Sequence, residues 1–133
     1  MNEQKLREII NTSPFGFAHH EIIVDSQNRP VDYRFLEVNP AFERLTGLSA
    51  NNVTGKTARE VIPGIEKADF DWIGFYGKIA LEGGNGSFEQ FSKPLNRWYQ
   101  VSVYSSQKGF FTTSFVDISE QKNVQNQLFK FNK

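Results

Sequence analysis

The chain has 133 residues, no cysteine, and 15 lysine or arginine residues balanced by 15 aspartate or glutamate residues. The length fits a single domain with a core of its own. The missing cysteines exclude disulfides, thiolate metal sites and cysteine nucleophiles, and the balanced charge gives no electrostatic basis for binding nucleic acid or an anionic membrane.

Hydrophobic periodicity and turn residues predict a mixed α+β order along the chain. Helices are expected at 2–10, 41–46, 49–53, 57–62, 70–82 and 119–133. Strands are expected at 16–24, 31–38, 87–93, 97–105 and 110–118. The short helices are grouped between strands and do not alternate with them. This order predicts an α+β domain with one antiparallel sheet and helices on one face.

Capping residues mark where several of these helices begin and end. Asn39 is a favourable N-cap before Pro40, and Gly47 supplies a left-handed C-terminal residue. Asp69 is expected to cap the longer helix, and the glycine-rich run 83–86 is expected to end it in a turn.

Two glycines one turn apart in that longer helix, Gly74 and Gly77, lower its intrinsic helix propensity. Small residues at these positions would let the helix lie close to a sheet.

The last helix carries an apolar seam with 3-4-3 spacing. Its residues are Gln121, Val124, Leu128 and Phe131, with Ser119 as the expected cap. The seam is too short for an isolated coiled coil, and the pattern is typical of a segment cut from a longer protein. The alternative is a terminal helix that folds back on its own domain.

Four motifs, in order, resemble the PAS sensory domain family. Residues 32–47 end a strand in N-P-A-F and a helix in T-G, and residues 53–56 resemble the family's V-x-G-K step. Residues 97–101 resemble its second long strand, and residues 116–122 resemble its D-I-S-E-x-K junction. The likeness covers about residues 9–130.

The resemblance implies a five-stranded antiparallel sheet with helices over one face and room for a pocket between them. It divides the chain into an N-terminal flanking helix at 1–13, a core at 14–118 and the start of a C-terminal signalling helix at 119–133. It also implies a sensor within a larger signalling protein. The output domain would be a histidine kinase, a cyclic-dinucleotide enzyme or a similar partner on the same polypeptide.

The resemblance also bears on cofactors. The family's flavin photosensors form an adduct with a cysteine, so the cysteine-free chain excludes that chemistry and any cysteine-linked chromophore. Haem-binding members place a histidine on the long helix, and 70–82 contains none. His19 and His20 are neighbours on a strand and point to opposite faces, so at most one could enter a pocket. The simplest expectation for that histidine is a partly buried, hydrogen-bonded side chain, and no metal site is expected.

A set of mostly apolar side chains is predicted to converge between the sheet and the helices. These candidates are Phe35, Phe42, Ile73, Tyr76, Ile79, Tyr99, Val101, Val103, Phe111, Thr113 and Phe115. Such walls suit a small organic ligand, although the same side chains could fill the core by themselves. Tyr99 and Thr113 are the polar positions, and a buried hydroxyl needs a partner.

Asp117 and Ser119 match the family's junction between core and output helix, where the aspartate ties the two together by a charge-assisted hydrogen bond or ion pair. The simpler alternative is that Asp117 only caps the helix. The resulting hypothesis is that a ligand or partner shifts the packing of the core. The shift then changes the direction in which the last helix leaves the domain. The domain is expected to form a homodimer through its flanking helices, with Phe129 and Trp98 on the dimer surface.

Two other functions compete with this hypothesis. The first is a homodimerisation module without a ligand. The second is a small cone-shaped α+β isomerase or hydrolase using Glu37, Asp71 or His19, although no nucleophile elbow or phosphate loop accompanies them. A non-enzymatic domain is therefore expected. Because no apolar run approaches the about 20 residues that span a bilayer, and residues 1–10 are too polar for a signal peptide, we expect a cytoplasmic location without membrane contact in this segment.

Overall fold

The computed structural model describes residues 2–131, with side chains described through residue 128. The helices are α1 (Glu3–Thr12), α2 (Pro40–Thr46), α3 (Ala50–Val53), α4 (Ala58–Val61), α5 (Trp72–Glu82), α6 (Ser119–Phe131) and the 3-10 helix η1 (Ile65–Lys67). The strands are β1 (Gly16–Val24), β2 (Pro30–Val38), β3 (Gly84–Ser92), β4 (Arg97–Ser105) and β5 (Phe110–Asp117). None of these helices is long and apolar enough to cross a membrane.

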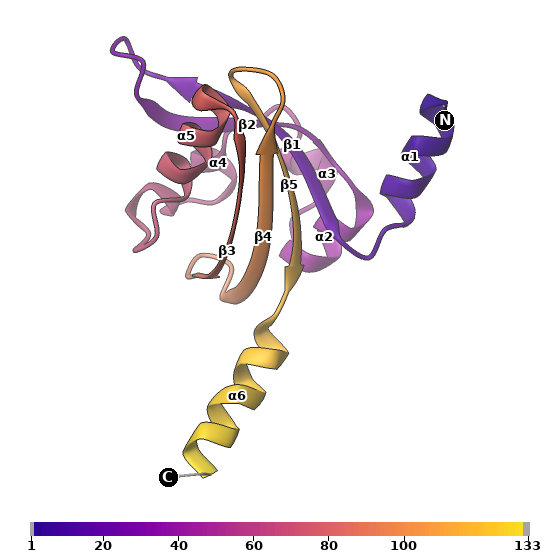
Figure 1. The fold of residues 1–133 in the computed structure, drawn as a ribbon, viewed down its shortest axis with the longest axis vertical. Coiled ribbons are helices and arrows are strands. Elements are labelled where there is room, and N and C mark those ends of the chain that lie inside the picture. The colour runs from indigo at the N-terminus through magenta and orange to yellow at the C-terminus, as the bar shows by residue number, and fades with distance from the viewer. Residues whose placement is uncertain (1, 132–133) are drawn as a thin grey trace.

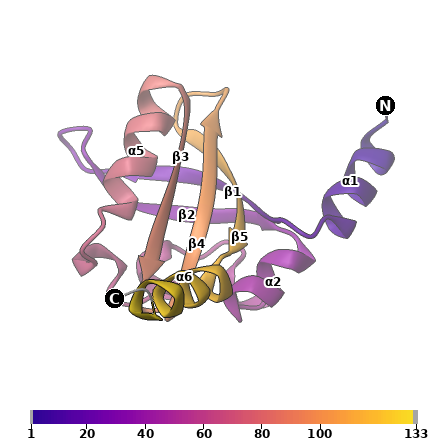
Figure 2. The same cartoon turned by 60° about the horizontal axis from the view of Figure 1, so that its bottom comes forward.

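The five strands form one antiparallel sheet in the order β2-β1-β5-β4-β3. The core lies between the inner face of this sheet and α2 to α5, while α1 lies beside the outer face and contacts α2 (Figures 1 and 2). The predicted α+β architecture is therefore confirmed.

Alternation along the strands decides which side chains enter the core. On β4, Tyr99, Val101 and Val103 are buried, whereas the residues between them are exposed. On β5 the buried set is Phe111, Thr113 and Phe115. Because antiparallel strands pair residues facing the same side, Val101 lies opposite Phe115 and Val103 opposite Thr113.

The predicted caps of α2 and α4 are present. The side chain of Asn39 accepts a hydrogen bond from the Phe42 N–H at 3.0 Å, and Gly47 ends α2 in the left-handed region. Thr57 and Glu60 form the capping box of α4.

Gly77 brings α5 close to the sheet, as its small size suggested. A Cβ atom on Gly77 would lie 2.3 Å from Cγ of Pro30, which begins β2. Only glycine therefore permits this approach between the helix and the strand.

Several predicted boundaries are wrong. The helix expected at 70–82 begins at Trp72, because the Asp71 carboxylate, and not Asp69, accepts the Gly74 N–H at 2.9 Å. The glycine-rich run is not simply a turn, because residues 84–86 pair with 103–105 as the first part of β3. Helix α1 extends to Thr12, and the short helix η1 was not predicted.

Candidate functional site

A cavity of about 70 Å³ lies between the inner face of the sheet and the helices. Seven predicted pocket residues line it: Phe35, Phe42, Tyr76, Tyr99, Val101, Thr113 and Phe115. Four others do not line it, although all four are buried in the surrounding core: Ile73, Ile79, Val103 and Phe111. A drug-sized ligand occupies about 300 Å³ or more. In its present shape the cavity is therefore too small for a flavin or a haem.

Further lining residues were not among the candidates. They include Ala18, His20, Tyr33, Trp72, Ser92 and the half-buried Thr46, Leu48, Ile62 and Leu95. The half-buried members come from loops and helix ends, where periodicity carries no information on burial. They form the part of the wall that lies nearest to solvent.

Two of the buried hydroxyls at the cavity have partners within the protein. The Tyr99 hydroxyl donates to the Leu45 carbonyl at 2.8 Å, and the Thr113 hydroxyl donates to the Ala18 carbonyl at 3.5 Å. Burial raises the pKa of Tyr99 to about 12, against the opposing effect of the nearby Arg97. Tyr99 is therefore a neutral hydrogen-bond donor that ties β4 to the end of α2.

His20 differs from its predicted environment. It is 3% exposed and lies among aromatic rings, with Phe111 stacked at 4.4 Å and Phe35 and Tyr33 edge-on at 4.9 and 5.0 Å. Its Nδ1 atom has no hydrogen-bond partner among the described residues. Burial lowers the pKa of His20 from 6.5 to about 3, only partly offset by the nearby backbone of Phe111. The expectation of a partly buried, hydrogen-bonded histidine is wrong for this residue.

One sequence signal could have identified His20. Along β1, His20 shares a face with the small apolar Ala18 and with Ile22, and both of these are buried. His19 points to the outer face, where its Nδ1 lies 2.8 Å from the Thr112 hydroxyl. Within the described residues, no three histidine or carboxylate side chains gather as metal ligands do.

The junction to α6 is built by hydrogen bonds between backbone and side chains. The Asp117 carboxylate accepts the Ser119 N–H at 2.8 Å. The Ser119 hydroxyl accepts the Trp98 N–H at 2.9 Å, so it bonds strand β4 and does not serve as the predicted cap. The Ile118 N–H donates to the Trp98 carbonyl at 2.8 Å. Both backbone groups of Trp98 are therefore bonded to the start of α6.

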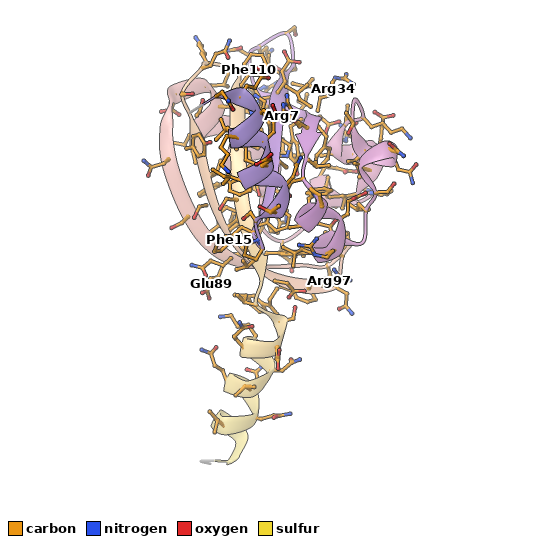
Figure 3. All side chains as sticks on the ribbon, turned by 90° about the vertical axis from the view of Figure 1, so that its right-hand side faces the viewer. Arg7, Phe15, Arg34, Glu89, Arg97 and Phe110 are labelled. Carbon is orange, nitrogen blue, oxygen red and sulfur yellow. The ribbon has the colours of Figure 1, made fainter. Side chains whose placement is uncertain are left out.

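Lys122, one turn into α6, adds a second set of contacts to the sheet. Its Nζ lies 2.8 Å from the Glu89 carboxylate on β3 and 4.9 Å from the centre of the Trp98 ring. Figure 3 shows Glu89 and Arg97 at the end of the sheet from which α6 leaves. These contacts hold the first turn of α6 against β3 and β4.

Beyond that turn, α6 runs away from the sheet (Figure 1). Val124 and Leu128 are 48% and 58% exposed, and Gln121 is also exposed. The alternative in which this helix folds back on its own domain is therefore wrong for the described part. The side chains of Phe129 and Phe131 lie outside the described residues.

The outer face of the sheet carries a groove of about 330 Å³ beneath α1. Arg7 on α1 forms an ion pair with Glu37 on β2 at 2.6 Å, and Figure 3 shows Arg7 in front of the sheet. His19 lies opposite Glu37 in the β1–β2 pairing and lines the same groove. Asp71 instead caps α5, so the three predicted catalytic candidates are not brought together, and none lines the inner cavity.

Comparisons with known proteins agree with this architecture. The model of a family described as PAS domain matches residues 4–80, which is more than half of the chain. No curated protein matches the chain.

Three solved structures share the fold. An RNA-binding light-oxygen-voltage receptor has a TM-score of 0.66 and 18% identity over 97% of this chain, which spans 36% of the receptor's length. A domain of a Geobacter sulfurreducens sensory box sensor histidine kinase/response regulator has a TM-score of 0.62 and 13% identity, covering 86% of this chain and 92% of that one. A domain of an HTR-like protein from Haloarcula marismortui has a TM-score of 0.54 and 24% identity, covering 80% and 99% respectively.

Proposed function

The chain belongs to the PAS family of sensory domains, and on that premise we propose that it reports the state of its core to an output domain through α6. The observation that carries the proposal is a pair of hydrogen bonds made by the Trp98 backbone. Its N–H donates to the Ser119 hydroxyl and its carbonyl accepts the Ile118 N–H, while the next residue on the strand, Tyr99, lines the cavity. A change in cavity packing that moves β4 would therefore move the start of α6.

We propose that the chain is divided into the three segments that the sequence predicts. Residues 1–13 flank the core, residues 14–118 form it, and residues 119–133 begin the signalling helix. In this scheme Asp117 and Ser119 form the junction between core and helix. The Asp117 side chain accepts a hydrogen bond from the start of α6, and the Ser119 side chain accepts one from β4. A cytoplasmic location remains the expectation from composition.

The output domain belongs to the proposal and lies outside this chain. Histidine kinases appear among the proteins with similar structures, including a blue-light activated histidine kinase from Erythrobacter litoralis with 21% identity and a TM-score of 0.55. A histidine kinase or a cyclic-dinucleotide enzyme on the same polypeptide would be positioned to respond to a rotation or register change of α6.

A homodimer joined through the flanking helices would cover the exposed seam of α6. Val124 and Leu128 lie four residues apart on one stripe of the helix, which is the spacing that pairs helices in coiled coils. On α1, Leu6 and Ile9 are also about half exposed. Pairing of the flanking helices would bury these apolar side chains, which no described contact covers at present.

Native mass spectrometry of the purified protein tests the dimer. We expect a dimer whose dissociation constant rises at least about tenfold in Leu128→Glu, since a buried apolar side chain contributes about 1.5–3 kcal/mol. Asn123→Glu, on another face of the same helix, is the control and is expected to dimerise as the wild type does. Equal dissociation constants for the two variants would contradict pairing through α6.

Native mass spectrometry before and after denaturation, together with a thermal-stability screen, distinguishes a ligand-binding sensor from a homodimerisation module without a ligand. The small volume of the cavity favours the second candidate, a homodimerisation module without a ligand. A small molecule that is released on denaturation supports the sensor. A clean dimer that gains no thermal stability from any member of a metabolite library supports the ligand-free module.

A further inference from the structure

Strand β3 forms one margin of the sheet, and its outer edge is unpaired (Figure 2). Among the described residues, the backbone of 84–92 makes no backbone hydrogen bond other than those to β4. The opposite margin is covered at β2, because the Phe35 N–H donates to the Lys56 carbonyl at 2.9 Å and the Gly55 N–H donates to the Phe35 carbonyl at 2.7 Å. The edge of β3 is therefore open to a further strand.

The features that usually prevent an edge strand from pairing are missing from β3. Its pairing with β4 runs over all of residues 84–92 without a register shift, whereas the pairing of β1 with β2 is interrupted by shifts. Residues 84–92 contain no lysine or proline, and Lys93 and Pro94 follow only after the strand has ended. The single charged side chain, Glu89, is paired with Lys122 at 2.8 Å. A long, regular and nearly uncharged edge of this kind is a template for another strand.

An aromatic cluster lies on the inner face of the sheet beside this edge. The centre of the Phe88 ring lies 4.8 Å from the ring centres of Phe70 and Phe75. It lies 5.5 Å from the ring of Trp72. Phe70, Phe75 and Phe88 are only half-buried. A strand added to β3 would place its inward-facing side chains beside Phe88 and cover this aromatic surface.

The sequence of β3 is complementary to itself in antiparallel pairing. A two-fold axis perpendicular to the sheet keeps the inner faces of two copies on the same side. The whole of 84–92 pairs only when this axis passes through Phe88, which places Phe88 opposite Phe88 of the second copy and Ser87 opposite Glu89. A register centred on Glu89 would instead set two carboxylates against each other, which is unfavourable.

We propose that the edge of β3 pairs with β3 of a second copy of this chain, so that the two sheets join into one. Backbone hydrogen bonds and packing between the two Phe88 side chains stabilise the contact. The axis at Phe88 makes the two α6 helices leave from opposite ends of the joined sheet, so this contact is distinct from pairing through α6 (Figure 1). A chain that uses both contacts forms tetramers and longer assemblies.

Amide hydrogen exchange at low and high protein concentration locates the contact without any substitution. We expect alternate amides of residues 84–92, those that point away from β4, to exchange several-fold more slowly at high concentration. The amides bonded to β4 should change less, because they are already protected. Exchange of the outward amides that does not depend on concentration would overturn the proposal.

Ser87→Glu and Ser102→Glu form a matched pair of variants with the same net charge. Ser102 lies opposite Ser87 on β4, is also exposed on the outer face, and is not at the edge. Only the carboxylate at position 87 faces Glu89 of the second copy, and it does so twice in the symmetric contact. We expect the dissociation constant, measured by sedimentation in a Leu128→Glu background, to rise about three- to tenfold in Ser87→Glu and to stay unchanged in Ser102→Glu.

The reverse charge gives the opposite expectation. Ser87→Lys places an ammonium group opposite Glu89 and should lower the dissociation constant. Equal dissociation constants for Ser87→Glu, Ser87→Lys and Ser102→Glu would overturn pairing through β3.

Failure of this contact and failure of the dimer through α6 give different results. If Leu128→Glu weakens association and the β3 amides remain unprotected, the dimer through α6 holds and the β3 contact fails. If Leu128→Glu has no effect and Ser87→Glu weakens association, the β3 contact holds and the dimer through α6 fails. A soluble peptide of alternating threonine and valine tests a foreign strand as the occupant. Protection of the β3 amides by this peptide without self-association of the chain would overturn pairing between two copies.

Discussion

Replacing Asn39 by alanine is expected to lower the free energy of unfolding by about 3–4 kcal/mol, well beyond the cost of losing a helix cap. The Asn39 side chain is almost fully buried and makes four hydrogen bonds. Its oxygen accepts the N–H groups of Phe17 and Phe42, and its amide donates to the carbonyls of Ile10 and Phe15. Alanine would leave all four backbone groups without this partner.

A simple cap in the same protein is the control for this prediction. Ser49 caps α3 by a single hydrogen bond to the exposed Asn52 N–H, so Ser49→Ala should cost only about 1 kcal/mol. Urea denaturation measures both variants. If Asn39→Ala cost no more than Ser49→Ala, Asn39 would be an ordinary cap and not the residue that joins α1, β1 and α2.

Acidification from pH 7 to pH 5 is expected to lower the free energy of unfolding by about 2 kcal/mol through His20 alone. Burial lowers the pKa of His20 to about 3, so the folded chain does not take up this proton at pH 5. In the unfolded chain His20 keeps its ordinary pKa of 6.5, so it takes up the proton below that pH. The stabilisation is therefore complete above pH 6.5 and is lost as the pH falls from 6.5 towards 3.

Chemical denaturation at several pH values measures this dependence. His20→Phe keeps an aromatic ring in the core and removes the titrating group. Between pH 7 and pH 5 its free energy of unfolding should therefore fall by about 2 kcal/mol less than that of the wild type. His19→Phe removes the partly exposed neighbour and should keep the wild-type dependence. Identical pH profiles for the wild type and His20→Phe would show that His20 is not buried in its neutral form.

The sheet could be predicted in large part because β4 and β5 carry the period-two pattern that one-sided burial imposes. The boundaries of β1 and β4 agree with prediction to the residue. Glycine was harder to interpret, since it permits turns and close approach equally well. Gly77 lies against Pro30 as its small size suggested, yet Gly84 and Gly86 are paired in β3 and not in a turn.

The candidate site could be predicted only in part. Residues on the buried stripes of β4 and β5 reach the cavity, because alternation fixes the side to which they point. Loop residues such as Leu48 and Leu95 reach it through tertiary packing, which local sequence does not encode. His20 was missed because adjacent histidines face opposite sides, and polarity alone does not show which one is buried.

The contacts provide a short route from the cavity to the signalling helix. Tyr99 lines the cavity and bonds the end of α2, and Arg97, on the same face of β4, donates to the carbonyls of Arg44 and Leu45. Trp98, between them, is bonded to Ile118 and Ser119 at the start of α6. A displacement of this part of β4 would therefore act on both α2 and α6. Modest differences in packing energy suffice to shift such an equilibrium.

The distance between spin labels on α6 and on the far end of the sheet tests this coupling most directly. The chain has no cysteine, so Gln127→Cys and Gln107→Cys introduce the only two labelling sites, and dilution with unlabelled protein keeps each distance within one chain. Val101→Phe places a larger ring in the cavity, whereas Ser102→Phe places it on the outer face of the same strand. The coupling predicts a change of about 2 Å or more in the mean distance for Val101→Phe and none for Ser102→Phe. An unchanged distance in Val101→Phe would contradict transmission from the core to α6.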